Sequence, residues 1–552
     1  MINVKFINQF LLQDMEIYDK IFPSINFTVT RYGSSALKQR LTYFSVDNLE
    51  NMIAITKYIN NANNYRNKIE SLLTDISTNK NTIDDWNNNF CDGDLYFVGY
   101  SEIFNNEFNL NITNKIKFSN VVILIIFYII MYIFFNATGI KMSITDYLKS
   151  IATGYYYMAS LILSVFIGSE TIVDWLSKGL TFLYLAYNIY SVYQTIITCV
   201  KHYTKCNEFK DTYHKMIKVI NICKNIWDLD MFKEKVLDES TLNLTTHSFV
   251  KLEKIFSDKE SLGYMIVTKL DCHKYQHYLS NILEYVGIVD MLISNSKLLR
   301  NGYTSPYIDM AYDKPYIVAE KIWNPLLNYK TQVKNECTVG LDNHQNMIIT
   351  GPNKAGKSTY LRSLILSIYL AQTLGVTCAQ KLYFTPFSEI FTYLNVPDTV
   401  GKESLFEAEL ERCYKYYNKV ITSNPTNKVI GFIDELFTGT NYYEGMAGSY
   451  AIVKKITESP YSITILTTHF HEICTIPNVS YNKFYATHGA GDASNTSKSK
   501  YKFSYMIEKG ISDQCIALDL LQERGYGNEL IEIAKTKLSE ALNKKNNKNI
   551  TS

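Results

Sequence analysis

The sequence predicts an α/β domain with a mostly parallel sheet flanked by helices, joined to a largely α-helical region. Three observations predict this class. A glycine-rich turn, GPNKAGKST, follows the apolar run at residues 347–349, and a second apolar run at residues 429–433 ends in two adjacent acids. Further towards the N-terminus, residues 118–200 contain three long stretches without a charged residue.

The glycine-rich turn has the spacing of a phosphate-binding loop. Gly351 is followed by four residues and then by Gly356, Lys357 and Ser358. In such a loop the backbone N–H groups surround the phosphates, the lysine adds positive charge and the hydroxyl ligates Mg²⁺. The run before the loop is expected to be a buried strand, and residues 360–366 a helix whose N-terminus points at the phosphates. The alternative is a turn that binds nothing.

The same motif gives the expected ligand contacts. We expect ATP with Mg²⁺ as the bound group and no structural metal elsewhere. The residues expected to contact the nucleotide are Gly351, Pro352, Asn353, Ala355, Gly356, Lys357, Ser358 and Thr359.

The second apolar run supplies the acids that a nucleoside triphosphatase needs. Asp434 and Glu435 follow residues 429–433, as at the carboxyl end of a central parallel strand. Asp434, with Ser358, is expected to hold Mg²⁺, and Glu435 to polarise the attacking water. The alternative is a pair of acids that merely caps the strand.

Four segments resemble the ATPase domain of the MutS family, the mismatch-repair branch of the ABC-type ATPases. They are GPNKAGKST, FTYLNVPDTVGKESLFEAELER at residues 391–412, DELFTGTNYYEG at 434–445 and TTHFHE at 467–472. The resemblance implies that Ser404 reaches the γ-phosphate bound by a partner subunit and that His469 senses that phosphate. Catalysis would then involve Glu435, Lys357, His469 and Ser404. The sequence departs from the family pattern at residues 354–355 and in a segment before Ser404 that is one residue short.

The resemblance extends to other parts of the chain. Residues 26–41 and 284–299 are similar to the core domain, residues 314–327 to the entry into the ATPase domain, and residues 509–538 to the C-terminal dimerisation helices. The expected organisation is a helical core at 1–117, an apolar insertion at 118–200, a helical lever and core continuation at 201–325, the ATPase domain at 326–510, a dimerisation element at 511–540 and a disordered tail at 541–552.

The apolar insertion predicts transmembrane helices. The run VVILIIFYIIMYIFF, within residues 118–140, is long enough to span a bilayer at ~1.5 Å per residue. Residues 150–169 and 179–200 are weaker candidates, and buried helices of a large core are the alternative. Two crossings and the flanking lysines would place the rest of the chain on the cytoplasmic or nuclear side of a membrane.

Composition adds little about partners. The net charge of +2 gives no overall basic field for nucleic acid, so DNA contacts would need a local patch. The abundance of Asn, Ile, Lys and Tyr suggests an AT-rich genome, such as that of a large virus.

The favoured function is a dimeric MutS-type ATPase that couples ATP hydrolysis to duplex DNA binding without an N-terminal mismatch-reading domain. The alternative is a membrane-anchored mechanical or scaffolding ATPase that has lost DNA binding.

Overall fold

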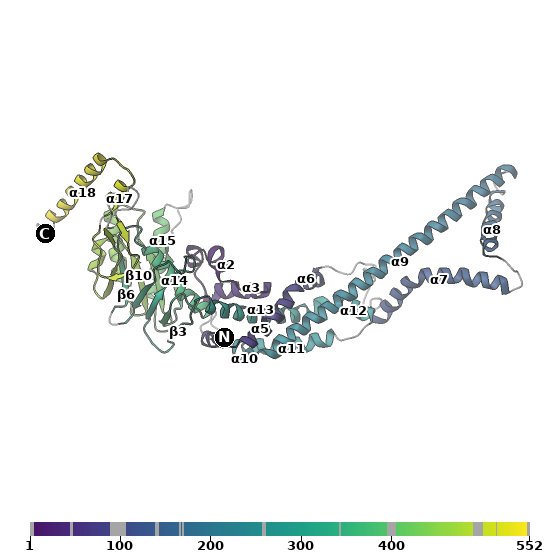
Figure 1. Cartoon of the computed structure of the whole chain (residues 1–552), viewed down its shortest axis with the longest axis horizontal. Coiled ribbons are helices and arrows are strands. Elements are labelled where there is room, and N and C mark those ends of the chain that lie inside the picture. Colours follow the sequence, from purple (N-terminus) through teal and green to yellow (C-terminus); the bar gives the residue numbers. More distant parts are fainter. Residues whose placement is uncertain are drawn as a thin grey trace. The chain divides into compact units, whose positions relative to one another are not determined.

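The computed structural model describes most of the chain (Figure 1). The described residues are 5–44, 48–88, 106–137, 143–164, 167, 170–256, 261–341, 344–394, 405–488, 501–514 and 516–548. The chain divides into two compact units. Unit 1 contains residues 1–74, 230–239 and 284–552, and unit 2 contains residues 75–229 and 240–283.

A six-stranded sheet forms the centre of the ATPase part of unit 1. Its strand order is β14 (Glu508–Lys509), β11 (Val479–Lys483), β6 (Asn346–Thr350), β10 (Ser462–Thr467), β9 (Val429–Asp434) and β8 (Glu389–Tyr393). All neighbouring strands are parallel except the edge strand β14. The strands β6, β9 and β10 are almost wholly buried, as expected of parallel strands covered on both faces.

Helices and smaller sheets surround this sheet. The helices are α14 (Lys357–Leu374), α15 (Leu405–Ile421), α16 (Tyr442–Ile456), the 3₁₀ helix η2 (His471–Thr475), α17 (Ala517–Glu523) and α18 (Asn528–Lys548). A four-stranded sheet has the order β3 (Tyr307–Ile308), β7 (Lys381–Phe384), β4 (Ile317–Ile322) and β5 (Asn335–Val339), and β12 (Ala486–His488) pairs with β13 (Tyr501–Phe503). Helix α18 continues to Lys548, into the segment expected to be a disordered tail.

Helices from the N-terminal region complete unit 1. They are α1 (Gln9–Asp14), the π-helix η1 (Ile17–Ile21), α2 (Phe22–Ile25), α3 (Arg31–Thr42), α4 (Leu49–Asn61), α5 (Asn63–Thr78) and α10 (Lys233–Val236), with the short strands β1 (Lys5–Phe6) and β2 (Tyr43–Phe44). Their packing on α14 is fixed by polar contacts: Arg40 Nε donates to Thr373 O at 2.8 Å and Tyr369 Oη to Leu41 O at 2.6 Å. The helix that begins at the phosphate-binding loop therefore ends against the core helices.

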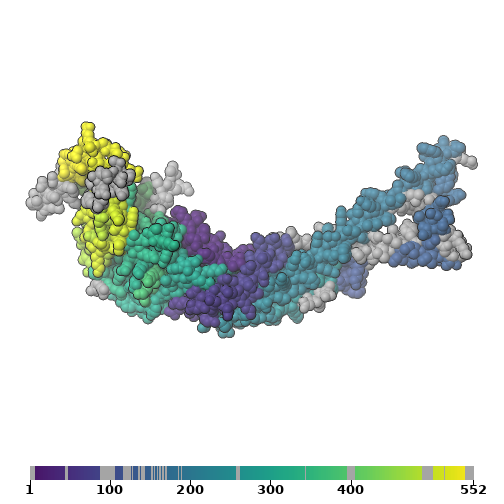
Figure 2. Space-filling model, in the orientation of Figure 1, coloured from purple at the N-terminus to yellow at the C-terminus, as the bar shows by residue number. Residues whose placement is uncertain are grey.

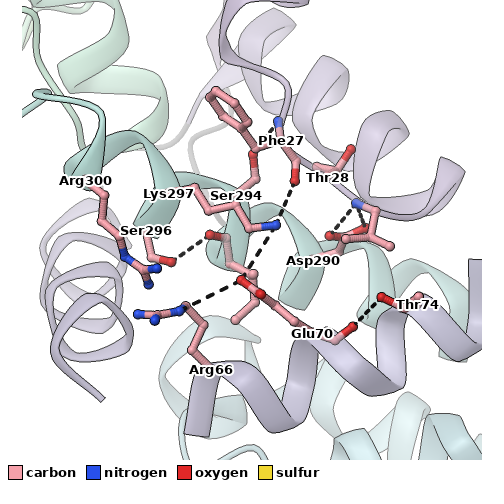
Figure 3. Close-up of polar contacts among 12 residues, drawn as sticks. Phe27, Thr28, Arg66, Glu70, Thr74, Asp290, Ser294, Ser296, Lys297 and Arg300 are labelled. Atoms are coloured by element: carbon pink, nitrogen blue, oxygen red, sulfur yellow. Dashed lines mark hydrogen bonds and ion pairs between the residues drawn. The ribbon is translucent and has the colours of Figure 1, made fainter. Parts of the chain in front are cut away.

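A buried carboxylate joins the two core-like segments that the sequence separates by some 250 residues. Asp290, on α13 (Cys272–Arg300), accepts hydrogen bonds from Val29 N, Thr30 N and Thr30 Oγ1, at the start of α3 (Figure 3). Gly33 is required there, because an added Cβ would lie 2.2 Å from Asp290 Oδ2. Beside it, Glu70 of α5 lies 3.6 Å from Lys297 Nζ and 3.9 Å from Arg66 Nε (Figure 3).

Unit 2 is helical. It contains α6 (Lys80–Asn88), α7 (Glu107–Ala137), α8 (Ile144–Ser164), α9 (Glu170–Leu229), most of α11 (Glu239–Ile255), α12 (Leu262–Leu270) and the first part of α13. Aromatic rings fill its core around Trp86, which packs against Tyr213 and Phe256, while Tyr275 packs against Phe256. Lys269 lies buried over the Trp86 ring and donates to Trp86 O.

The prediction of transmembrane helices is wrong. Within the residues that the structure describes, no helix is long and apolar enough to cross a membrane. Most side chains of the first apolar stretch, at residues 118–140, lie outside the described residues. The other apolar stretches belong to helices that also carry charges: Asp174 and Lys178 form an ion pair on α9, and this helix continues for 60 residues. The predictions of a membrane partner and of a membrane location are wrong for the same reason.

Candidate nucleotide-binding site

The phosphate-binding loop joins β6 to α14 and has the backbone that its glycines predict. Gly351 has a φ of 147°, and a Cβ there would lie 2.6 Å from Phe484 O. Gly356 has a φ of 109° and directly precedes α14. Both positions lie in the region that favours glycine, so the loop can bring its backbone N–H groups close to a phosphate.

Lys357 begins α14 and is held inside the loop. Its side chain is buried, and Nζ donates a hydrogen bond to Gly351 O at 2.7 Å. Burial lowers the pKa of Lys357 below its ordinary value, against the opposing effect of Glu435 and Asp434. A buried ammonium inside a phosphate-binding loop is suited to an anionic ligand, because an anion favours its charged form.

The two acids lie at the carboxyl end of β9, next to the end of β10. Asp434 is paired in register with Thr467, whose Oγ1 donates to Asp434 Oδ1 at 2.5 Å. Glu435 has a φ of 59°, and its N–H donates to Thr467 O at 3.2 Å. This left-handed turn directs Glu435 away from the strand, so that Oε1 lies 3.9 Å from Lys357 Nζ.

His469 joins the acid and the loop. Its Nε2 lies 3.0 Å from each of three atoms: Glu435 Oε1, Lys357 Nζ and Asn353 Oδ1. A neutral imidazole nitrogen either donates or accepts. If Nε2 carries the proton it donates to Glu435 or Asn353; if it does not, it accepts from Lys357. The hydrogen bond to His469, followed by the charges of His469 and Lys357, lowers the pKa of Glu435, which keeps this carboxylate ionised.

A cavity of about 410 Å³ lies over the loop. The loop residues that line it are Pro352, Asn353, Lys354, Gly356, Lys357, Ser358 and Thr359, together with Glu435. Among the predicted contacts, the Ala355 side chain is buried, so Ala355 can offer only its backbone. Lys354, one of the two departures from the family pattern, has a φ of 69° and an exposed side chain.

The rest of the cavity wall was not predicted. It includes residues 331–333, Asn335 and Tyr505, whose ring lies next to Gly356 of the loop. Asn335 fixes the wall, because its Nδ2 donates to Tyr505 O at 2.9 Å and its Oδ1 accepts from Ile507 N at 2.8 Å. No local motif marks these residues, which lie about 20 residues before the loop and about 150 after it.

A buried acid on α15 supports the segment after Glu435. Glu409 Oε1 accepts from Thr438 N at 3.3 Å and from Thr438 Oγ1 at 3.0 Å, while Oε2 accepts from Gly439 N at 3.1 Å. The sequence identified this glutamate only as part of a resemblance. Ser404, directly before α15, lies outside the described residues, so its role in a partner's site stays a prediction.

The residues present fit a hard divalent cation. Ser358 offers an exposed hydroxyl in the cavity, and Asp434 offers a carboxylate at the adjacent strand end. Mg²⁺ prefers such oxygen ligands and usually takes the remainder from phosphates and water. In the described part of the chain, no group of three or more His, Cys, Asp or Glu side chains could hold a metal ion.

Comparisons with known proteins agree with this geometry. Residues 347–542 match the model of MutS domain V. The chain is 29% identical to human MutS protein homolog 4 over 296 residues, which are 51% of this chain and 29% of that protein. It is 28% identical to the DNA mismatch repair protein MutS of Caldanaerobacter subterraneus over 269 residues, 48% of this chain and 29% of that protein. A DNA mismatch repair protein MSH3 of Candida glabrata is 26% identical over 262 residues, 47% of this chain and 25% of that protein.

These matches support the resemblance to the MutS family. The chain carries an ATPase domain similar to MutS domain V, and the matched part spans less than a third of each relative's length.

Proposed function

We propose that this chain is an ATP hydrolase that works as a dimer and couples its ATPase cycle to duplex DNA. One observation carries the proposal: side chains from the ends of β6, β9 and β10 converge beside one cavity, with His469 Nε2 3.0 Å from both Glu435 Oε1 and Lys357 Nζ. A lysine at a phosphate-binding loop and a carboxylate that can orient the attacking water are groups that phosphoryl transfer to water uses.

Each residue has a role that its position supports. The loop N–H groups and Lys357 bind the β- and γ-phosphates, and the phosphate takes the place of Gly351 O and His469 as a partner of the ammonium. Glu435 is then free of Lys357 and accepts a hydrogen bond from the attacking water. His469, protonated on Nε2, donates to Glu435 or to the terminal phosphate. Mg²⁺, held by Ser358 and Asp434, would neutralise charge on the phosphate oxygens.

The part of the cavity wall at Val333 and Tyr505 suits the nucleobase. Tyr505 offers an aromatic ring and Val333 an aliphatic side chain, both on the cavity wall. Aromatic rings bind bases by stacking, which adds affinity for any base. Stacking at Tyr505 would therefore orient the triphosphate towards the loop without selecting strongly between bases.

The C-terminal helices are the proposed dimerisation element. Leu530, Ile533 and Leu538 are exposed apolar side chains on α18, and Figure 2 shows the C-terminal segment in yellow at the surface of the ATPase part. Apolar side chains on an exposed helix are suited to a protein interface. Through such a dimer, Ser404 of one subunit would act at the nucleotide of the other.

Coupling to DNA is proposed from the relatives, two of which are named DNA mismatch repair proteins. The physical link available in unit 1 is α14, which begins at Lys357 and ends against α3 and α4. A change at the phosphates can therefore reach the core helices through one rigid element.

The direct test is Glu435→Gln. Because the amide cannot act as a base, turnover should fall by about two orders of magnitude or more, while ATP affinity measured by equilibrium titration stays close to the parent's. Lys357→Ala should instead weaken ATP binding itself. Hydrolysis at the parent rate by the Glu435→Gln protein would remove this residue from the proposed role. Stimulation of turnover by duplex DNA at low salt, lost as salt rises, tests the DNA coupling.

A further inference from the structure

Unit 2 contains a second cavity, remote in sequence from the nucleotide site. Its volume is about 480 Å³, comparable to the cavity over the phosphate-binding loop. It lies among α7, α9 and the residues that begin α12, and α12 packs against both longer helices (Figure 1). A volume of this size is typical of small-molecule sites, which range from about 300 to 1,000 Å³.

The described lining of this cavity is cationic. Lys115 comes from α7 and Lys210 from α9, so positive charge enters from two walls. Among the residues that the structure describes, no carboxylate lines the cavity and none forms an ion pair with either lysine. His202, whose Nε2 lies 3.6 Å from Cys206 Sγ, adds a buried imidazole that can donate or accept a hydrogen bond. Two lysines that line one cavity without an acid create a positive potential there, which favours an anion.

The polar groups around these cations suit an oxyanion. Asn207 and Tyr203 on α9 also line the cavity and offer an amide and a hydroxyl. Phosphate esters carry about two negative charges near neutral pH and several acceptor oxygens, whereas a carboxylate carries one charge. The set of two ammonium groups, an imidazole, an amide and a hydroxyl therefore matches phosphate better than carboxylate.

Hydrogen bonds that do not involve Lys115 or Lys210 hold the walls of the cavity in place. Asn111 of α7 bridges to the start of α12: its Nδ2 donates to Ser261 Oγ at 2.6 Å and its Oδ1 accepts from Gly263 N at 2.7 Å. A Cβ on Gly263 would lie 2.2 Å from Glu107 O, so only glycine permits this approach. Beneath the polar groups, Leu110, Cys206 and Ile266 form an apolar cluster. The cavity is therefore a preformed pocket with a cationic side and an apolar floor.

We propose that this pocket binds a small phosphate-bearing molecule of about nucleotide size. The phosphate lies between Lys115 and Lys210, and the less polar body of the molecule lies towards the floor at Leu262 and Cys206. The volume of about 480 Å³ and the walls from α7, α9 and the start of α12 suit a molecule of this size. The proposal is independent of ATP hydrolysis at Lys357.

The test uses the full-length chain with Lys357→Ala, which weakens phosphate binding at the loop. Titration calorimetry with pyrophosphate, and separately with AMP, should show saturable binding at one site per chain. Adding Lys115→Ala and Lys210→Ala together should weaken pyrophosphate binding by about a hundredfold, roughly tenfold for each charge-assisted hydrogen bond lost. Binding of AMP in addition to pyrophosphate would support a ligand of about nucleotide size, whereas binding of pyrophosphate alone would contradict that size.

Lys218→Ala is the matched control, because it removes the same charge from α9 outside the pocket. It should leave the pyrophosphate affinity within about twofold. The proposal is overturned if neither probe binds saturably, if the double variant binds as the parent does, or if Lys218→Ala has the same effect. It is also overturned if the two pocket lysines affect only the binding of a short duplex DNA. Equal unfolding midpoints of the variants in urea will show that the folds are comparable.

Discussion

Arg412 of α15 forms an ion pair with Asp14 of α1, and both side chains are buried, with 5% and 4% of their surface exposed. Asp14 Oδ2 also accepts from Leu394 N at 3.2 Å, and Arg412 Nε donates to Thr392 O at 2.9 Å. The guanidinium lies over the ring of Phe10, 4.4 Å from its centroid. The first helix of the chain is thus fixed to the helix that carries Glu409, on which the segment after Glu435 depends.

We predict that Arg412→Ala destabilises the protein strongly. The substitution leaves the Asp14 carboxylate buried without its cation, and breaking a buried pair in this way costs about 3–5 kcal/mol. The free energy of unfolding, measured in urea, should fall by this amount. Lys415→Ala, which breaks the exposed pair with Glu411 on the same helix, should cost less than about 1 kcal/mol. Equal losses in the two variants would contradict a special role for the buried pair.

Glu409→Gln is predicted to slow turnover with little effect on ATP affinity. The amide retains one acceptor oxygen, so either Thr438 or Gly439 loses its partner, and an amide nitrogen then faces an N–H donor. The unpaired groups should cost about 1–3 kcal/mol of stability. Because Thr438 and Gly439 follow Glu435, the proposed catalytic base, kcat should fall while the ATP dissociation constant changes by less than about threefold. Glu411→Gln, an exposed acid two residues away, is the control and should leave both quantities unchanged.

Tyr505→Ala should weaken ATP binding through the base alone. Loss of one stacking aromatic corresponds to about a tenfold lower affinity. Inorganic triphosphate has no base, so its affinity should be the same in the parent and the variant, which makes it the internal control. A parallel loss for both ligands would show that the substitution disturbs the loop rather than a base site.

The sequence predicted those parts of the site in which the chemistry fixes the spacing of nearby residues along the chain. A loop that is to wrap a phosphate needs glycines and a lysine at fixed spacing, as at residues 351–358, and a buried strand must precede the acids at 434–435, so short patterns suffice. Tyr505 lies about 150 residues from the loop, and Asp14 lies 398 residues from Arg412. Contacts between residues so far apart in the sequence depend on the tertiary fold. The hydrophobic periodicity of the sequence does not reveal them.

The transmembrane prediction failed for a related reason. Local composition at residues 179–200 describes a short apolar stretch, whereas the structure shows this stretch within the 60 residues of α9. Segment composition does not reveal where a helix begins and ends. The ion pair between Asp174 and Lys178, one turn apart on the same helix, shows that charges lie close to the apolar side chains.

Mixed subunits test whether the ATP site is shared. Leu405 begins α15, so the preceding Ser404 is attached to the helix that carries Glu409. If Ser404 acts on the neighbour's phosphate, Ser404→Ala and Lys357→Ala chains should each be inactive, and their mixture should regain about a quarter of the parent's turnover through one intact site per heterodimer. Sedimentation must show that dimers have formed. An inactive mixture of dimers would show that each site is complete within one chain.

The last prediction concerns the charge on Lys357. Burial lowers its pKa in the nucleotide-free fold, whereas in the unfolded chain the pKa returns to about 10.5. Between these two values the unfolded chain binds more protons than the folded one, so the free energy of unfolding rises with pH across that window. The free energy of unfolding of the parent minus that of Lys357→Met should therefore increase as the pH rises from the lowered pKa of the folded chain towards 10.5, because methionine does not titrate. A saturating triphosphate should reverse this trend in the parent, since the phosphate favours the charged lysine and its pKa then rises above the unfolded value. If the difference in the free energy of unfolding does not change with pH, with or without the ligand, then burial does not lower the pKa of Lys357. In that case Lys357 does not pair with the phosphate either.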